Sequence, residues 1–259
     1  MTAVSAMRPV FDGERTVPSR LADDVVERIA AALLDGRIEP DAPLPSEGEI
    51  AREFGVSKPI AREALRQLAG VGLVATRQGR VARARALNGD SLDRFYGFAV
   101  RASLTHLREA NEMRMVVETG IARLAARRRA DEGVAAMAAA VADMERAILK
   151  PAAFTDADIA FHLGLALATR NSMIRVQMEG LKSVQVGVSA LFAQRASRTK
   201  QDWLGTIERH RRIHDAVAAG DESEAARCIA AHYQAADIAS LEVARDVEPQ
   251  RPTRRRARA

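Results

Sequence analysis

Apolar residues recur at helical spacing along most of this chain, and strand-like alternation is confined to one short stretch. Near the N-terminus the pattern predicts helices over about 21–34, 46–54 and 58–69, followed by two short strands at 73–76 and 81–84. Gly-containing turns separate these segments, including Gln-Gly-Arg between the two strands. Three helices followed by a β-hairpin are typical of a helix–turn–helix unit with a wing.

Local signals predict where these helices begin and what they bury. Ser46 and Glu49 have the Ser-x-x-Glu spacing of a capping box, so the second helix should begin there. Ser57 is a natural N-cap for the third helix, and the proline that follows lies in the first turn, where no hydrogen bond is lost. Leu21 opens the apolar stripe that we expect the first helix to bury.

Beyond about residue 90 only helical spacing is present. Asp131, Thr155 and the pair Gly220-Asp221 are the expected caps between helices. We therefore expect a mainly α fold, in which an N-terminal winged helix–turn–helix precedes an all-α antiparallel bundle. The helix-period segments of that bundle cover about 91–103, 105–129, 131–149, 155–170, 172–198, 202–219 and 221–244.

Composition fits a helical protein and excludes other classes. Aromatic residues are only 4% and apolar residues 47%, which argues against a β-sandwich and against wholesale disorder. No stretch approaches the roughly 18 apolar residues that a membrane span needs, and the N-terminal residues lack the apolar segment of a secretory signal. The single cysteine, Cys228, excludes an internal disulfide and fits a reducing compartment. We therefore expect a cytoplasmic protein with no membrane partner.

The net charge of +5 is placed unevenly. The last nine residues hold five arginines and no acid, so the rest of the chain sums to about zero. That end is most simply a solvated basic tail. Residues 52–85 are different, because eight Lys and Arg residues there oppose only Glu53 and Glu63.

Lys58, Arg62 and Arg66 are spaced by four and therefore share one face of the third predicted helix. Such a face, backed by an apolar one, fits a DNA major groove, where Arg and Lys reach guanine O6 and N7 or phosphates. A solvated amphipathic helix would show the same charge pattern. The capped helix before it and the basic hairpin after it favour DNA.

The segment LPSEGEIAREFGVSKPIAREALRQLAGVGLVATRQGR resembles the winged helix–turn–helix of GntR-type bacterial transcription regulators, over about residues 18–85. The resemblance implies that Ser57, Lys58 and Arg62 approach bases and phosphates, and that Gly79 at the wing tip enters the minor groove. Gly48 departs from the family, which usually has Arg there. The expected DNA-binding residues are Ser46, Arg52, Ser57, Lys58, Arg62, Arg66, Gly79 and Arg80.

Three histidines and one aspartate lie on core-facing helical stripes. Asp158 and His162 are four residues apart on one face, and His210 and His232 each share an apolar stripe on another helix. Each histidine alone is more often a hydrogen-bonded core residue. Together, neutral imidazoles and a carboxylate suit Zn²⁺, Ni²⁺ or Mn²⁺, with positions left for water or an anion. A zinc peptidase is rejected, because Arg211 follows His210 where His-Glu-x-x-His requires Glu.

Three segments resemble the FCD effector-binding domain of the FadR subfamily: LREANEMRMVVETGIARLAA, DIAFHLGLALATRNSM and HRRIHDAVAAGDESEAARCIAAHY. The resemblance spans about 90–240. In the metal-binding branch of that family the ligands correspond to Asp158, His162, His210 and His232, and zinc is the expected ion. His214 is then expected to support a ligand from outside or to pack in the bundle.

Arg114 lies on an apolar stripe and needs a partner there. One candidate is Glu118, one turn later, and the other is the carboxylate of an effector bound beside the metal. The resemblance favours the effector and implies a pocket with Arg114, Glu118 and Asn171. Ser189 and Arg195 are further candidates.

The sequence therefore predicts a transcription regulator, most simply a repressor, that binds a pseudo-palindromic operator as a homodimer and answers to a small organic acid. A regulator that senses the metal itself is the alternative. A metal-dependent hydrolase is disfavoured, because the sequence offers no well-placed base beyond Glu118 and no nucleophile. The expected segments are a flexible leader (1–17), the DNA-binding domain (18–85), a linker (86–90), the effector and dimerisation domain (91–245) and a basic disordered tail (246–259), in a protein associated with the nucleoid.

Overall fold

The chain divides into two compact units, residues 1–86 and 87–259. The computed structural model describes residues 20–77, 79–193 and 199–247. The expected leader (1–17), Arg195 and the tail from 248 onward lie outside the described residues. Among those described, no helix combines the length and the apolar character needed to cross a membrane.

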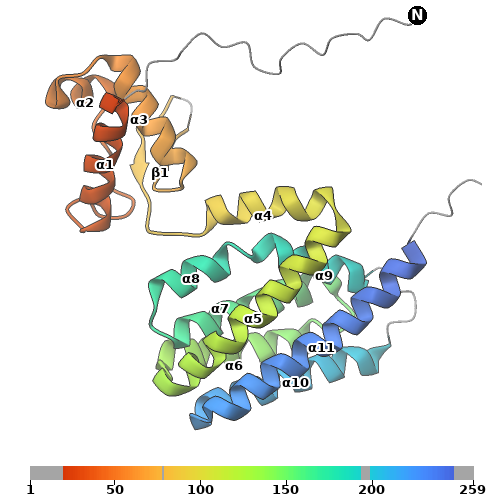
Figure 1. Cartoon of the computed structure of the whole chain (residues 1–259). Helices are drawn as coiled ribbons and strands as arrows, with labels where there is room; N and C mark the ends of the chain where they lie inside the picture. Colours follow the sequence, from red (N-terminus) through yellow and green to blue (C-terminus); the bar gives the residue numbers. More distant parts are fainter. Residues whose placement is uncertain (1–19, 78, 194–198, 248–259) are drawn as a thin grey trace, which may run out of the picture. The chain divides into compact units, whose positions relative to one another are not determined.

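The first unit is a three-helix cluster with a short hairpin (Figure 1). Its buried core includes Val25, Ile50 and Leu68. The two strands are antiparallel, and Val74 pairs with Ala84. The elements are α1 (Arg20–Leu34), α2 (Glu47–Phe54), α3 (Lys58–Gly70), β1 (Val74–Ala75) and β2 (Arg83–Ala84).

Local chemistry sets the ends of α2. The Ser46 hydroxyl accepts from the Glu49 amide at 3.3 Å, and the Ser46 amide donates to the Glu49 carboxylate at 2.7 Å, so the predicted capping box is confirmed. Such a cap contributes about 1 kcal/mol. The prediction for Leu21 is wrong, because Leu21 is 55% exposed and the neighbouring Ala22 is buried in its place. A shift of one residue turns the side chain by about 100° around a helix.

The second unit is all-helical within the described residues (Figure 1). Its core is one continuous apolar cluster that includes Phe161, Leu165 and Ile213. The elements are α4 (Asp90–Ala102), α5 (Leu104–Arg128), α6 (Asp131–Arg146), α7 (Pro151–Ala168), α8 (Ser172–Glu179), α9 (Lys182–Ala193), α10 (Lys200–Ala219) and α11 (Glu222–Val247).

The single helix expected over 172–198 is instead two helices, α8 and α9. The break falls at Gly180, where a β-carbon would lie 2.5 Å from that of Leu92, so close packing of α4 requires glycine. The cap expected at Thr155 is also wrong. Helix α7 begins earlier, at Pro151, and the Thr155 hydroxyl donates to the Pro151 carbonyl at 3.0 Å.

Helices α6 and α7 approach each other closely, and this contact positions α7. At Gly164 a β-carbon would lie 2.9 Å from the Met137 amide nitrogen, and at Gly133 it would overlap the backbone of Ala168. Backbone atoms cannot move aside as a flexible side chain can. Both positions therefore require glycine, which has no side chain. Helix α7 carries Asp158 and His162, so this packing places both side chains.

Candidate functional site

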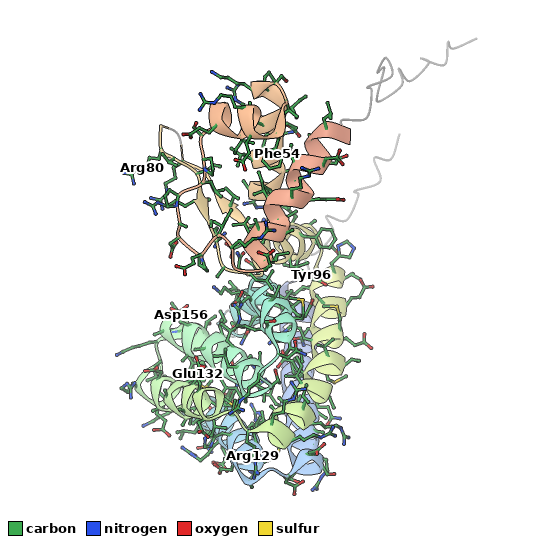
Figure 2. The ribbon with its side chains drawn as sticks, turned by 90° about the vertical axis from the view of Figure 1, so that its left-hand side faces the viewer. Phe54, Arg80, Tyr96, Arg129, Glu132 and Asp156 are labelled. Carbon is green, nitrogen blue, oxygen red and sulfur yellow. The ribbon has the colours of Figure 1, made fainter. Side chains whose placement is uncertain are left out.

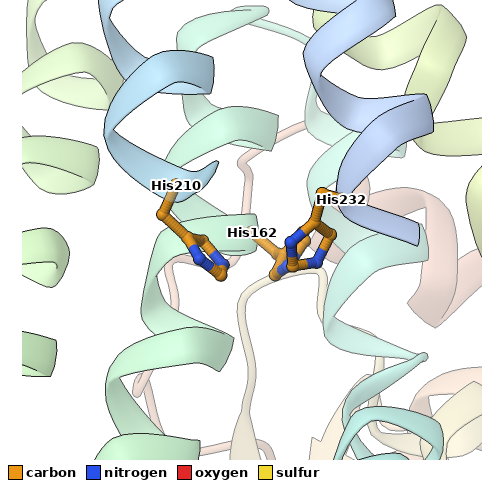
Figure 3. A group of neighbouring side chains, drawn as sticks. All are labelled: His162, His210 and His232. Atoms are coloured by element: carbon orange, nitrogen blue, oxygen red, sulfur yellow. The ribbon is translucent and has the colours of Figure 1, made fainter. Parts of the chain in front are cut away.

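Three buried histidines from three helices meet inside the second unit. His162 comes from α7, His210 from α10 and His232 from α11, and Figure 3 shows their rings converging. One nitrogen of each ring lies within 4.8 Å of the others. A single ion could be held at this spacing, since metal–nitrogen bonds are about 2 Å long.

Two nitrogens in the cluster are buried without a hydrogen-bond partner, namely Nε2 of His210 and Nδ1 of His232. The other ring nitrogen of His210 contacts the Thr206 carbonyl oxygen at 2.9 Å, which orients the ring. Asp158 Oδ1 lies 2.9 Å from His210 Nε2, without hydrogen-bond geometry, and 4.0 Å from His162 Nε2. Orphaned imidazole nitrogens beside a carboxylate form a donor set that fits a divalent transition metal.

The buried carboxylate of Glu118 connects the histidine cluster to two neighbouring polar side chains. Its Oε1 accepts from Arg114 Nε and Nη2 at 3.1 and 2.9 Å and from the Tyr233 hydroxyl at 2.6 Å. Its Oε2 bonds to Nδ1 of His162. The Arg114 guanidinium also lies over the Tyr233 ring, 5.4 Å from the centroid. Glu118 therefore neutralises Arg114 and holds the His162 ring in one orientation.

Burial and charge act in opposite directions on the acids of the site. Burial raises the pKa of Glu118, but the charges of His162 and Arg114 and the hydrogen bonds outweigh it and bring the pKa to about 2. Burial likewise opposes ionisation of Asp158, while His210 holds its pKa well below the usual range. Burial, helped by the other two histidines, lowers the pKa of His232, so this ring is neutral and ready to bind a metal.

A cavity of about 60 Å³ opens beside the cluster. This exceeds the roughly 10–15 Å³ that a cavity needs to admit a water molecule, so the cavity is accessible to solvent or to a small ligand. It is lined by polar and apolar side chains from several helices: Asn111, Arg114, Pro151, Phe154, Thr155, Asp158, His162, Gln185, Val188, Ser189, Thr206, Arg209, His232 and Tyr233.

Two residues expected near this site lie elsewhere. Asn171 does not line the cavity, because its side chain caps α8 and accepts from the amides of Met173 and Ile174 at 3.0 and 3.3 Å. His214 is outside the three-histidine cluster, and its Nδ1 lies 2.9 Å from Asp215 Oδ1. His214 therefore makes no hydrogen bond to the clustered histidines within the described part of the chain, whereas a residue supporting a ligand would make one.

Sequence reasoning missed several polar residues of the cavity, including Thr206 on α10. Asn111 and Arg114 are three residues apart on α5, so the stripe that singled out the arginine also pointed to the asparagine. Gln185 donates to Asp158 Oδ2 from α9. Tyr233 follows His232 directly, and Arg209 precedes His210.

The first unit carries a groove between α3 and the hairpin. It is lined by Ser46, Glu47, Gly48, Lys58, Arg62, Leu65, Arg66, Thr76, Arg77, Gly79, Arg80, Val81, Ala82 and Pro45. Every residue expected to bind DNA is exposed, and Arg80 points away from the helices of its unit (Figure 2). Arg52 and Ser57 lie outside the residues lining the groove.

Two arginines of α3 are held by acids. Arg62 donates to both carboxylate oxygens of Glu47, at 2.8–3.0 Å, and Arg66 donates to Glu63 at 2.9 Å. Ser57 makes no side-chain cap bond, so its hydroxyl is available to another partner. At Gly48 an added β-carbon would lie 3.4 Å from the Lys58 side chain, so Lys58 lies over the place where a larger residue would project.

Two family models match the chain, each within one unit. Residues 21–83 match the model described as "Bacterial regulatory proteins, gntR family", and residues 109–235 match the FCD domain. Between the two matches, residues 84–108, which include α4, are not covered.

Individual proteins match over most of their lengths. The HTH-type transcriptional regulator LutR of Bacillus subtilis is 29% identical over 76% of this chain and 91% of its own. The galactonate operon transcriptional repressor of Escherichia coli is 28% identical over 79% and 90%. The putative L-lactate dehydrogenase operon regulatory protein of the same species is 27% identical over 83% and 84%. A GntR structure from Streptococcus agalactiae has the same fold, with a TM-score of 0.66 at 23% identity, covering 84% of this chain and 99% of its own.

Proposed function

Because this chain belongs to the gntR family of bacterial regulatory proteins and carries an FCD domain, it is a transcription regulator and not an enzyme, and we propose that it is a repressor released from its operator by a small organic acid. The acid would bind beside a metal ion in the second unit. The observation that carries the proposal is the cavity next to three buried histidines, two of which have unpartnered nitrogens.

On the DNA side, α3 would lie in the major groove with Ser57, Lys58 and Arg62 at bases and phosphates, and the hairpin turn with Gly79 and Arg80 at the minor groove. The groove of cationic side chains in the first unit supports this assignment. Phosphate contacts of this kind supply much of the affinity and make it salt-dependent. Ser46, Arg52 and Arg66 would contact the sugar–phosphate backbone of the DNA.

In the second unit, Asp158, His162, His210 and His232 would hold the ion, which zinc fits best among zinc, nickel and manganese. The ion would supply a Lewis-acid position that binds one carboxylate of the effector. Glu118 would keep His162 in the orientation needed for binding.

A small acid suits the remaining space. Among the described residues Nη1 of Arg114 makes no hydrogen bond, so this nitrogen can donate to a ligand although Glu118 already neutralises the side chain. Two of the relatives are named for operons of lactate and galactonate, which are both hydroxy acids. Comparable chemistry here would be a small hydroxycarboxylate.

We expect a homodimer, since two heads related by a two-fold axis read a pseudo-palindromic site. Acid binding would shift the population of bundle conformations and thereby the spacing of the two heads. The protein would act at the nucleoid, in the cytoplasm.

The test is a thermal melt of the purified protein against a panel of small carboxylates, with zinc and with a chelator. A ligand at about 100 times its Kd stabilises by roughly 2.7 kcal/mol, which raises Tm by about 5–10 °C at this size. The acid-dependent rise should vanish with the chelator and in His210→Ala, and persist in His214→Ala. If the chelator lowers Tm and no acid raises it, the metal is structural or is itself the signal.

A further inference from the structure

Arg209 differs from the neighbouring arginines of its helix because it has no carboxylate partner among the described residues. It lies on α10 and lines the cavity, and its Nε is buried without a hydrogen-bond partner. Its only hydrogen bond among the described residues runs from Nη2 to the Thr206 hydroxyl at 3.0 Å, and no described carboxylate pairs with it. On the same helix Arg211 pairs with Glu145 and Glu208, and Arg212 pairs with Glu208.

The other arginine of the cavity differs in this respect. Arg114 is 3% exposed and is balanced by Glu118 at 2.9 Å, so that pair adds no net charge. Arg209 makes no ion pair with a described carboxylate, and the acid that acts on it, Asp202, does so only through space, two turns away on the same helix. A cation held in a cavity wall with an unpartnered donor favours an anionic group on the ligand.

The charge of the occupied site follows from its parts. With a divalent ion, an ionised Asp158, the balanced Arg114–Glu118 pair and Arg209, the site carries a net charge of about +2. A monocarboxylate leaves part of this charge unbalanced. A dianion balances it.

We propose that Arg209 receives a second carboxylate, so that the effector is a short dicarboxylate rather than a monocarboxylate. This inference rests on the proposed function, because it places the first carboxylate at the metal site. The cavity is small, about 60 Å³, which favours a short ligand. The Asn111 amide, also in the cavity wall, adds a hydrogen-bonding group for the ligand.

The experiment is calorimetric titration of the zinc-loaded protein with two matched pairs of acids, in which a terminal methyl group is replaced by a carboxylate. The pairs are 2-hydroxybutanoate with malate, and lactate with tartronate. The wild type should bind the dicarboxylate of at least one pair about 10- to 100-fold more tightly, as expected for one charge-assisted contact. Arg209→Gln should bring that ratio close to one, because it should weaken binding of the dicarboxylate far more than binding of the monocarboxylate.

Two variants serve as controls. Arg212→Gln removes an exposed cation of the same helix and should keep the preference, and Arg209→Lys, which retains the charge, should keep part of it. Equal binding of both acids by the wild type overturns the inference but leaves the proposed function standing. A preference that survives in Arg209→Gln also overturns it. Failure of every acid to bind removes the proposed function and the inference together.

Discussion

Glu118→Ala should be among the most damaging single changes in the second unit. The carboxylate is fully buried and holds Arg114, Tyr233 and His162 at once. Its removal leaves the Arg114 guanidinium, which is 3% exposed, without a charge partner. Breaking a buried pair in this way costs about 3–5 kcal/mol, and for a protein of this size that lowers Tm by roughly 6–20 °C.

The assay is a thermal melt followed by circular dichroism, with Glu222→Ala as the matched control. Glu222 also pairs with an arginine, Arg127, but Arg127 is exposed and Glu222 is partly exposed, so solvent screens the pair and its loss should cost far less than the loss of Glu118. The double variant Arg114→Met/Glu118→Leu should lose less stability than the two single changes summed, by about 1 kcal/mol or more. Equal losses for Glu118→Ala and Glu222→Ala would refute the reasoning.

The same change should weaken metal binding. Without Glu118 the Nδ1 of His162 loses the carboxylate that orients the ring, and loss of such a partner lowers metal affinity about 10- to 100-fold. Competition with a colorimetric zinc chelator measures this directly. Unchanged zinc affinity would mean that the ring is oriented by packing alone.

Three further predictions concern other parts of the chain. Arg62→Ala should abolish specific operator binding in a gel-shift titration, whereas Arg37→Ala, an exposed and ion-paired cation of the same unit, should not. Asn171→Ala should cost about 1 kcal/mol of stability through the lost N-cap and leave acid binding by calorimetry unchanged. Gly133→Ala places a methyl group on the backbone of α7 and should cost at least about 1–3 kcal/mol in denaturant unfolding, whereas Gly120→Ala, with open space around it, should not destabilise. The first expectation would be contradicted if Arg62→Ala and Arg37→Ala bound the operator equally well, and the second if Asn171→Ala impaired acid binding. The third would be contradicted if Gly133→Ala were tolerated as well as Gly120→Ala.

Helices were predictable where their causes are local. Apolar spacing and the Ser46–Glu49 capping box need only a few neighbouring residues, and both were confirmed. The break at Gly180 depends on packing against Leu92, which is 88 positions earlier in the chain, so no local signal marks it. At the start of α1, burial of Ala22 instead of Leu21 likewise depends on which side the rest of the unit covers, whereas Val25 and Ile29 of the predicted stripe are buried.

The candidate site also contains some residues that local spacing predicted and others that only the fold brings together. Spacing by four suggested Asp158 with His162, and it also named Glu118 as one partner for Arg114. That Tyr233 and His162 reach the same carboxylate from other helices required the fold. Arg209 was missed because it stands in a run of charged residues, which is typical of a solvated face.

The central claim is that an acid at the metal site controls operator binding. The most direct measurement is fluorescence anisotropy with an operator duplex that the protein itself selects from random sequences. For the zinc-loaded protein, a saturating acid identified by the melts should weaken operator binding at least about 10-fold, which corresponds to roughly 1.4 kcal/mol of coupling. The chelated protein and His210→Ala should show no such change. Unchanged operator affinity in the zinc-loaded wild type, with the acid bound, would contradict the account.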